Sequence, residues 1–273
     1  MKAQSQSFTK ISLTFIGLII VSTMAMLLIG SWLTTMIDVP KGMNLIILQW
    51  FTTIGAMMIP GYWLFKQVKS IGQQGPLTLT VVLSAIGLFS LWMPLAEYAM
   101  NGLLGLAEAS NITWVQKQIA ESAVHAELFG QMIFMPGWAY RLMGALTVIL
   151  LPAVAEEYFF RGGIQRLLGQ VMSHRLALVL TALVFSLAHG LPLQVPYLFA
   201  GGLIIGYAYQ VTGKLWVPIA AHALHNAIVY GFVMQGGPER LSGDHSMPVL
   251  AIAICSLAAI AASYVVIQSA NKA

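Results

Sequence analysis

Long apolar runs separated by short polar segments dominate this chain, and they lack the alternating or amphipathic patterns of soluble domains. A run of about 20 apolar residues can cross the ~30 Å hydrocarbon core of a bilayer as an α-helix. The pattern therefore predicts about eight membrane-spanning helices. We place them near residues 11–33, 43–65, 77–96, 138–168, 175–193, 196–212, 214–233 and 248–268.

Composition supports the same fold class. Of the 273 residues, 58% are hydrophobic and 8% charged, whereas soluble domains are about 25% charged. We therefore predict an all-α fold, a polytopic transmembrane helical bundle embedded in a lipid bilayer. The net charge of +4 is scattered between the spans, so no nucleic acid partner is expected. The single Cys255 excludes an intrachain disulfide framework and a cysteine-rich metal site.

The basic residues predict the orientation. With about eight spans, both termini lie on one side, and the positive-inside rule makes that side cytoplasmic. The first apolar stretch, from Ile11 to Gly30, is interpreted as an uncleaved span because no A-x-A-like site follows it. The basic residues then assigned to the cytoplasm are Lys2, Lys10, Lys66, Lys69, Arg166, Arg175, Lys214 and Lys272.

One long segment, 97–137, is predicted to lie outside the membrane. Its mixed apolar and polar pattern is typical of an amphipathic helix on the outer surface, or of a connecting loop that contains a helix. Further along, Gly202 and Gly206 have the small-residue spacing that allows two helices to pack closely.

Two adjacent acids, Glu156 and Glu157, lie inside a long apolar run. A carboxylate in hydrocarbon is costly, so an intramembrane acid is a functional-site hypothesis. On a helix Glu157 shares a face with Arg161 and can pair with it, which leaves Glu156 available for chemistry. If the helix continues through Leu168, Glu156 lies about 18 Å from the cytoplasmic end. The alternative, that both acids only form salt bridges, is incomplete because one arginine serves two carboxylates.

Two later spans carry polar pairs at helical spacing, Phe185 with His189 and His222 with Asn226. A carboxylate can take a proton from water held by a histidine, and His plus Asn can donate hydrogen bonds to an oxyanion. Alternatively, Glu156, His189 and His222 could bind a divalent metal such as zinc, although the HExxH spacing is absent. The remaining histidines are interpreted as packing or surface residues: His125, His174, His225 and His245.

These groups form three motifs in order: Glu156-Glu157-x-x-x-Arg161, Phe185-x-x-x-His189 and His222-x-x-x-Asn226. The set resembles the signature of the CPBP intramembrane proteases, a family that includes the CAAX prenyl endopeptidases and the bacteriocin-processing and immunity proteins. The resemblance covers about residues 140–230, and its flanking text is similar to the bacterial branch. It implies a multi-pass protein of the bacterial inner (cytoplasmic) membrane.

The resemblance implies a role for each motif residue. Glu156 corresponds to the catalytic glutamate that activates water, and His189 to the histidine that shares this water. His222 and Asn226 correspond to the pair assigned to oxyanion stabilisation, while Arg161, with Glu157, is mainly structural. Members have been described both as metalloproteases and as metal-independent glutamate proteases. We favour the metal-independent form, with no cofactor, because pairing of Glu157 leaves a thin ligand set.

The predicted organisation has three regions: membrane spans and an outer loop in 1–137, a four-span catalytic core in 138–233, and an outer loop with a final span in 234–273. The predicted function is hydrolysis of a peptide bond in a membrane-associated protein or peptide, in a water-filled cavity. A prenylated substrate does not follow, and the oligomeric state is left open.

Two other functions remain open at this stage. One is a non-catalytic regulatory or bacteriocin-immunity protein, which would retain the motifs for structure. The other is a proton-coupled transporter, for which paired inverted halves with interrupted helices would be typical but are not found in the sequence.

Overall fold

The computed structural model describes residues 2–70, 78–109, 112–236 and 249–270. Within these ranges every regular element is helical and no strand occurs, which confirms the predicted all-α class. Four stretches are long and apolar enough to cross a membrane: Phe8–Met36, Lys41–Gln67, Trp138–Gly169 and Trp216–Gln235. Leu79–Ser90 and His174–Ala188 are shorter apolar helices. The chain is a helical membrane bundle.

Each predicted span corresponds to a helical stretch. In chain order the elements are α1 (Lys2–Met36), α2 (Lys41–Thr53), η1 (Ile54–Met58), α3 (Ile59–Gln67), α4 (Leu79–Ala109), α5 (Thr113–Ile133), α6 (Trp138–Ala145), η2 (Leu146–Leu150), α7 (Leu151–Glu156), η3 (Glu157–Gln165), α8 (Arg166–Gly169), α9 (His174–Ala188), η4 (Pro192–Gln194), α10 (Val195–Thr212), α11 (Trp216–Gly236) and α12 (Val249–Ala270). Segments η1, η2 and η3 are π-helical, and η4 is a 3₁₀ turn.

The segment 97–137 differs from its predicted form. Helix α4 continues to Ala109, beyond the predicted end at residue 96, and α5 fills most of the remainder. The prediction ended the span where hydropathy falls at Glu97, but Glu, Ala and Leu are all strong helix formers and sustain the helix. A helix in this segment is therefore confirmed, and its place on the outer surface stays a prediction. Residues 237–248, with His245, lie outside the described ranges.

The chain divides into two compact units. Unit 1 comprises Met1–Ile71 and Gln131–Ala177, and unit 2 comprises Gly72–Gly130 and Leu178–Ala273. Helices from the range 138–233 occur in both units.

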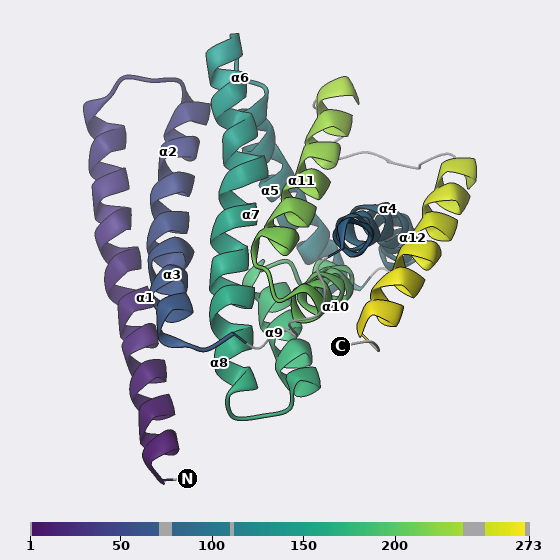
Figure 1. Cartoon of the computed structure of the whole chain (residues 1–273). Helices are drawn as coiled ribbons and strands as arrows, with labels where there is room; N and C mark the ends of the chain where they lie inside the picture. The colour runs from purple at the N-terminus through teal and green to yellow at the C-terminus, as the bar shows by residue number, and fades with distance from the viewer. Residues whose placement is uncertain (1, 71–77, 110–111, 237–248, 271–273) are drawn as a thin grey trace. The chain divides into compact units, whose positions relative to one another are not determined.

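Unit 1 is built from three long helical rods, α1, α2–η1–α3 and α6–η2–α7–η3–α8, which pack side by side (Figure 1). The second and third rods approach closely at Gly61 of α3, where an added Cβ would lie 2.7 Å from the Cα of Phe159. Close by, a Cβ on Gly163 would lie 3.1 Å from Leu64. Helix α3 therefore rests directly on η3, which begins at Glu157.

Prolines account for two of the π-helical segments. A proline inside a helix lacks the N–H and collides with the carbonyl four residues earlier, which favours a local change of winding. Pro60 follows η1 by two residues, and Pro152 stands in the same relation to η2. In both cases the carbonyl four residues before the proline lies inside the π-helical turn. Segment η3 contains no proline, so it has a different origin.

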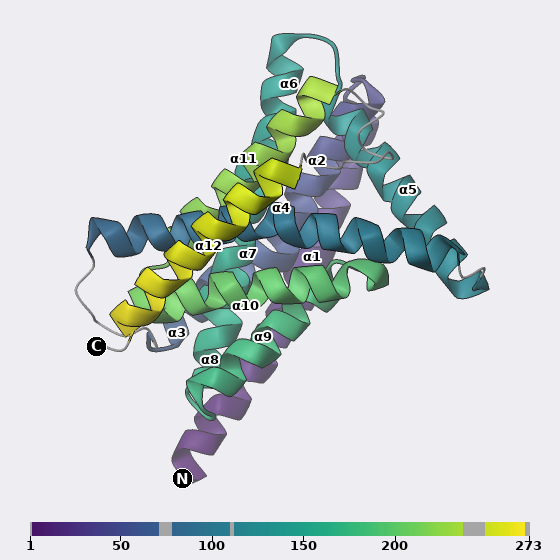
Figure 2. The same ribbon diagram turned by 90° about the vertical axis from the view of Figure 1, so that its right-hand side faces the viewer.

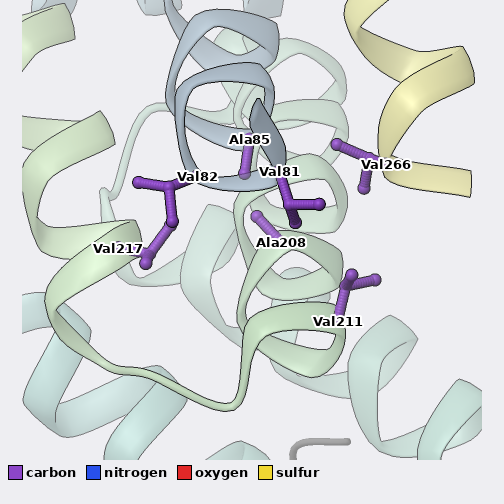
Figure 3. Packing of buried hydrophobic residues seen from close by; sticks show 7 residues of the cluster. All are labelled: Val81, Val82, Ala85, Ala208, Val211, Val217 and Val266. Atoms are coloured by element: carbon purple, nitrogen blue, oxygen red, sulfur yellow. The ribbon is translucent and has the colours of Figure 1, made fainter. Parts of the chain in front are cut away.

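Unit 2 is organised around α4, which α10, α11 and α12 contact (Figure 2). The buried contact consists of small and β-branched side chains, which allow helices to cross at short distance. Its members are Val81, Val82 and Ala85 of α4, Ala208 and Val211 of α10, Val217 at the start of α11, and Val266 of α12 (Figure 3). The predicted short turn between α10 and α11 is also present, with Gly213 at φ 63°.

The contact at Gly61 generates a stability prediction. Gly61→Ala should destabilise the protein by about 1–3 kcal/mol, because the new methyl group meets the backbone of η3, which cannot move aside as a side chain could. The matched control is Gly17→Ala in α1, where nothing lies within 4 Å of the added Cβ. Thermal unfolding of the purified proteins in detergent should place Gly61→Ala well below wild type and Gly17→Ala at or slightly above it. Equal midpoints for the two variants would contradict the close approach.

Candidate active site

The first motif contains a fully buried ion pair. Arg161 Nη1 donates to Glu157 Oε1 at 3.1 Å, and the two side chains are 1% and 0% exposed. The predicted pairing is therefore observed, although the helix here is π-wound and not α. In a π-turn the backbone bonds residue i to i+5, so residues four apart still lie nearly one turn along the helix. The helix also continues beyond Arg161 to Gly169, as the depth argument requires.

Glu156 has a different environment from its neighbour. It is the last residue of α7, where the α-winding changes to π, and its side chain is only partly buried. Its Oε2 atom is nevertheless shielded from solvent and has no hydrogen-bond partner among the described residues. A buried, unsatisfied carboxylate oxygen costs free energy unless a ligand or water occupies the position beside it. One acid of the pair is thus bound by arginine, and the other presents an oxygen atom that is available to a ligand.

His189 lies one residue beyond the end of α9. Its Nδ1 is 2.8 Å from the carbonyl oxygen of Phe185. Because a carbonyl oxygen can only accept, Nδ1 carries the proton, and in the neutral ring Nε2 keeps its lone pair. The rings of His189 and Phe185 also meet edge to face at 4.8 Å. The imidazole is thereby fixed in one tautomer, with Nε2 available to accept a proton, a hydrogen bond or a metal ion.

Two glycines hold the second motif in place. Gly190, at φ +67°, ends α9 directly after His189, a conformation that glycine adopts without strain. On the adjacent helix, a Cβ added to Gly202 of α10 would lie 3.1 Å from Ala182 and 3.3 Å from the Phe185 ring. The close packing predicted from the Gly202–Gly206 spacing is confirmed at Gly202. Helix α10 therefore supports the helical turn from which His189 projects.

The third motif lies on α11. His222 and Asn226 are one helical turn apart, and His222 is buried. Phe89 of α4, 4% exposed, presents its ring edge-on to both His222 (6.1 Å between centroids) and His225 (5.4 Å). His225 is buried too, and its Nδ1 has no hydrogen-bond partner among the described residues. Its interpretation as a packing residue agrees with this contact.

The structure thus forms the site in two parts. Glu156, Glu157 and Arg161 lie in unit 1, and His189, His222 and Asn226 in unit 2. Their convergence on one polar cavity stays a prediction of the sequence. Sequence reasoning missed Phe89, because it stands in an apolar helix without polar neighbours and nothing in the local pattern marks it.

The donor set can be assessed for a metal. Within either unit, the described residues contain no group of three or more His, Cys, Asp or Glu side chains placed to hold an ion. A metal would therefore need donors from both units of the chain, namely Glu156 from unit 1 and His189 and His222 from unit 2. The lone pair on His189 Nε2 suits an imidazole–metal bond, and one carboxylate with two imidazoles is the smallest set that a catalytic zinc uses.

Comparison with known proteins adds a family to this geometry. Residues 136–228 match the family described as type II CAAX prenyl endopeptidase Rce1-like. The membrane-embedded CAAX protease MroQ of Staphylococcus aureus (strain USA300) is 34% identical over 100 residues, which are 34% of this chain and 40% of that relative. No solved structure matches the chain.

The findings support a CPBP family protein. The matched segment agrees with the range 140–230 over which the three motifs suggested the resemblance, and it contains every residue of those motifs. The helices before and after it, α4 with Phe89 among them, lie outside the match. The alignment with the Staphylococcus aureus relative covers only 40% of that protein. The activity and substrate of this chain therefore need their own argument.

The ion pair generates the second prediction. Arg161→Ala would leave the buried Glu157 carboxylate without this partner, and the expected loss is about 3–5 kcal/mol of stability. Glu156→Gln, which keeps shape and removes a partly exposed charge, should cost much less. The comparison is made by thermal unfolding and by the yield of purified protein.

A double variant tests the reason for that loss. Glu157→Leu combined with Arg161→Met should recover much of the stability, because no charge is then left buried. If Arg161→Ala and Glu156→Gln unfold at the same temperature, Arg161 is not a structural residue.

Proposed function

We propose that the chain is an intramembrane endopeptidase that hydrolyses a peptide bond of a membrane-associated protein or peptide. The observation that carries the proposal is the contrast between the two acids. Glu157 is fully buried and is paired with Arg161 through Oε1. Glu156 is only partly buried, forms no ion pair among the described residues, and has a shielded Oε2 without a hydrogen-bond partner. A base that activates water needs such an oxygen within hydrogen-bond reach of that water.

The proposed reaction starts with a water hydrogen-bonded to Glu156 and to Nε2 of His189. The Glu156 carboxylate takes a proton as the water oxygen attacks the scissile carbonyl carbon. The carbonyl oxygen becomes an oxyanion, which accepts hydrogen bonds from His222 and Asn226. Cleavage of the C–N bond then releases the amine, which takes the proton held by Glu156.

Water and substrate class follow from the membrane location. Irregular backbone and polar chemistry at membrane depth require a cavity that borders protein or water, so the proposed site opens to water, on the cytoplasmic side in the predicted orientation. The name of the relative in Staphylococcus aureus assigns it to CAAX proteases. For this chain we propose a peptide segment at the membrane, with or without a lipid modification.

A metal-dependent version would use the same residues. Glu156, His189 and His222 would hold the ion, which would act as Lewis acid on the scissile carbonyl. The residues fit such an ion only as a minimal set, because Arg161 occupies the second carboxylate. We therefore propose the metal-independent form.

The third prediction tests the assigned roles. Glu156→Gln should abolish cleavage, whereas Asn226→Ala should leave slow activity, about 10²–10³-fold below wild type, because one oxyanion donor is lost. His125→Gln, an exposed change on α5, serves as control and should cleave normally. The readout is the set of membrane proteins that accumulate uncleaved in cells carrying each variant.

Retention of the cellular phenotype by stable Glu156→Gln protein would instead favour a non-catalytic regulatory or immunity protein. A defect in proton-coupled uptake, with no accumulating substrate, would favour a transporter.

The fourth prediction separates the two chemistries. The substrate for this test is a peptide from a membrane protein that accumulates uncleaved in cells carrying Glu156→Gln. Purified wild-type protein should cleave it at an unchanged rate after treatment with a strong chelator. Elemental analysis of the same active sample should find far less than one zinc per chain. Loss of activity on chelation, its return with added zinc, and occupancy that tracks activity would together overturn the metal-independent mechanism.

A further inference from the structure

A cluster of cations and aromatic rings lies at one end of unit 1, where α3 and α8 finish. The guanidinium of Arg166 lies 4.2 Å from the centroid of the Phe65 ring, and its side chain is only 8% exposed. The ammonium of Lys66 lies 5.3 Å from the centroid of the Tyr62 ring. Cations over aromatic faces are held in preferred positions without neutralisation of their charge.

The rings form a connected support for these cations. Tyr158 of η3 contacts Tyr62 at 5.9 Å and Phe65 at 5.3 Å between ring centroids. The support therefore joins α3 to the helix that carries the first motif. Tyr62 is 50% exposed, so one face of the support is open to the surroundings.

A hydrogen-bonded bridge brings a third cation to the same place. Gln170 Nε2 donates to the carbonyl oxygens of Lys69 and Arg166, each at 3.3 Å. The backbones of Lys69 and Arg166, 97 residues apart in sequence, are thus held by one side chain. The ammonium group of Lys69 is exposed at this end.

The local charge has one sign. Residues 59–71 and 158–177 contain no Asp or Glu, while they contain Lys66, Lys69, Arg166 and Arg175 in addition to the paired Arg161. A concentration of positive charge without a carboxylate in the flanking segments favours an anion from outside the protein.

The position in the helices identifies that anion. Lys66 and Arg166 stand in the last turns of two stretches long enough to cross a membrane, Lys41–Gln67 and Trp138–Gly169, so the cluster lies at the level of the lipid headgroups. Tyrosine side chains are enriched at this level, and basic pockets between transmembrane helices bind anionic headgroups. We propose that Lys66, Lys69 and Arg166, with Tyr62 beside them, bind the phosphate of an anionic phospholipid.

Such a site would connect the membrane composition to the first motif. Helix α8 continues η3 without a break, so a lipid bound to Arg166 stabilises the end of the helix on which Arg161 stands. Any ligand that binds only the folded state raises the stability by mass action. This inference does not rest on proteolysis, and its test needs no substrate.

The test measures unfolding and lipid retention of the full purified chain. Phosphatidylglycerol added to the detergent should raise the thermal unfolding midpoint, and native mass spectrometry should detect retained lipid, whereas phosphatidylcholine at equal concentration should do neither. Lys66→Gln with Lys69→Gln should weaken binding of phosphatidylglycerol about 30-fold, since each cation near an anionic surface contributes about a five-fold factor. Both positions are exposed, so the double variant should fold.

Two controls make the result specific. Lys41→Gln removes an exposed cation at the start of α2, the opposite end of the same rod, and should leave lipid binding unchanged. Lys66→Arg with Lys69→Arg keeps the charge and should bind phosphatidylglycerol as wild type does. Equal shifts with both lipids, or undiminished binding by the double glutamine variant, would overturn the site. A shift reproduced in full by inorganic phosphate would show a site for a free anion and overturn the lipid proposal.

Discussion

The buried pair of Glu157 and Arg161 is the interaction on which the first half of the site depends. Two charges withdrawn from water cost several kcal/mol each, and only close contact with further hydrogen bonding offsets that cost. In η3 the two groups are in direct contact, and α3 packs closely against this segment because Gly61 has no side chain. Because Arg161 is paired with Glu157, the proposed mechanism gives the reaction to the adjacent Glu156. Structural and chemical roles are thereby divided between neighbouring residues.

The winding of the helix reinforces this division. Glu156 closes an α-helical segment and Glu157 opens a π-helical one, and π-helical turns occur frequently at functional sites. A proline lies just after each of the other two π segments, so their winding follows from local covalent geometry. At η3 no such cause exists, and the segment instead coincides with Gly162 and Gly163 and with the closest contact of α3. The unusual winding therefore occurs where the rods press together and the motif begins.

Much of the architecture could be predicted from the sequence because bilayer thickness fixes the length of an apolar run. The helical stretches, the turn at Gly213, and the pairing of Glu157 with Arg161 depend on contacts within a few residues. Contacts between distant helices leave no such signal. Phe89 contacts His222 from a helix more than a hundred residues away in sequence, and hydropathy cannot show which of many apolar residues contacts a given histidine. The continuation of α4 to Ala109 was missed for a related reason, since falling hydropathy marks a membrane boundary and does not end a helix.

The two histidines of the proposed site are held in different ways, and this difference bears on their chemistry. His189 donates from Nδ1 to a backbone carbonyl, so its neutral ring offers only a lone pair to the reacting water. An oxyanion has the opposite requirement, because it needs N–H groups directed at it. The ring of His222 lies farther from that of Phe89 than the ring of His189 lies from that of Phe185. His222 is also one helical turn from Asn226, whose side-chain amide can always donate a hydrogen bond. In the proposed mechanism, the backbone hydrogen bond at the end of α9 therefore suits His189 to accept a hydrogen bond from the water, and His222 and Asn226 of α11 provide the donors to the oxyanion.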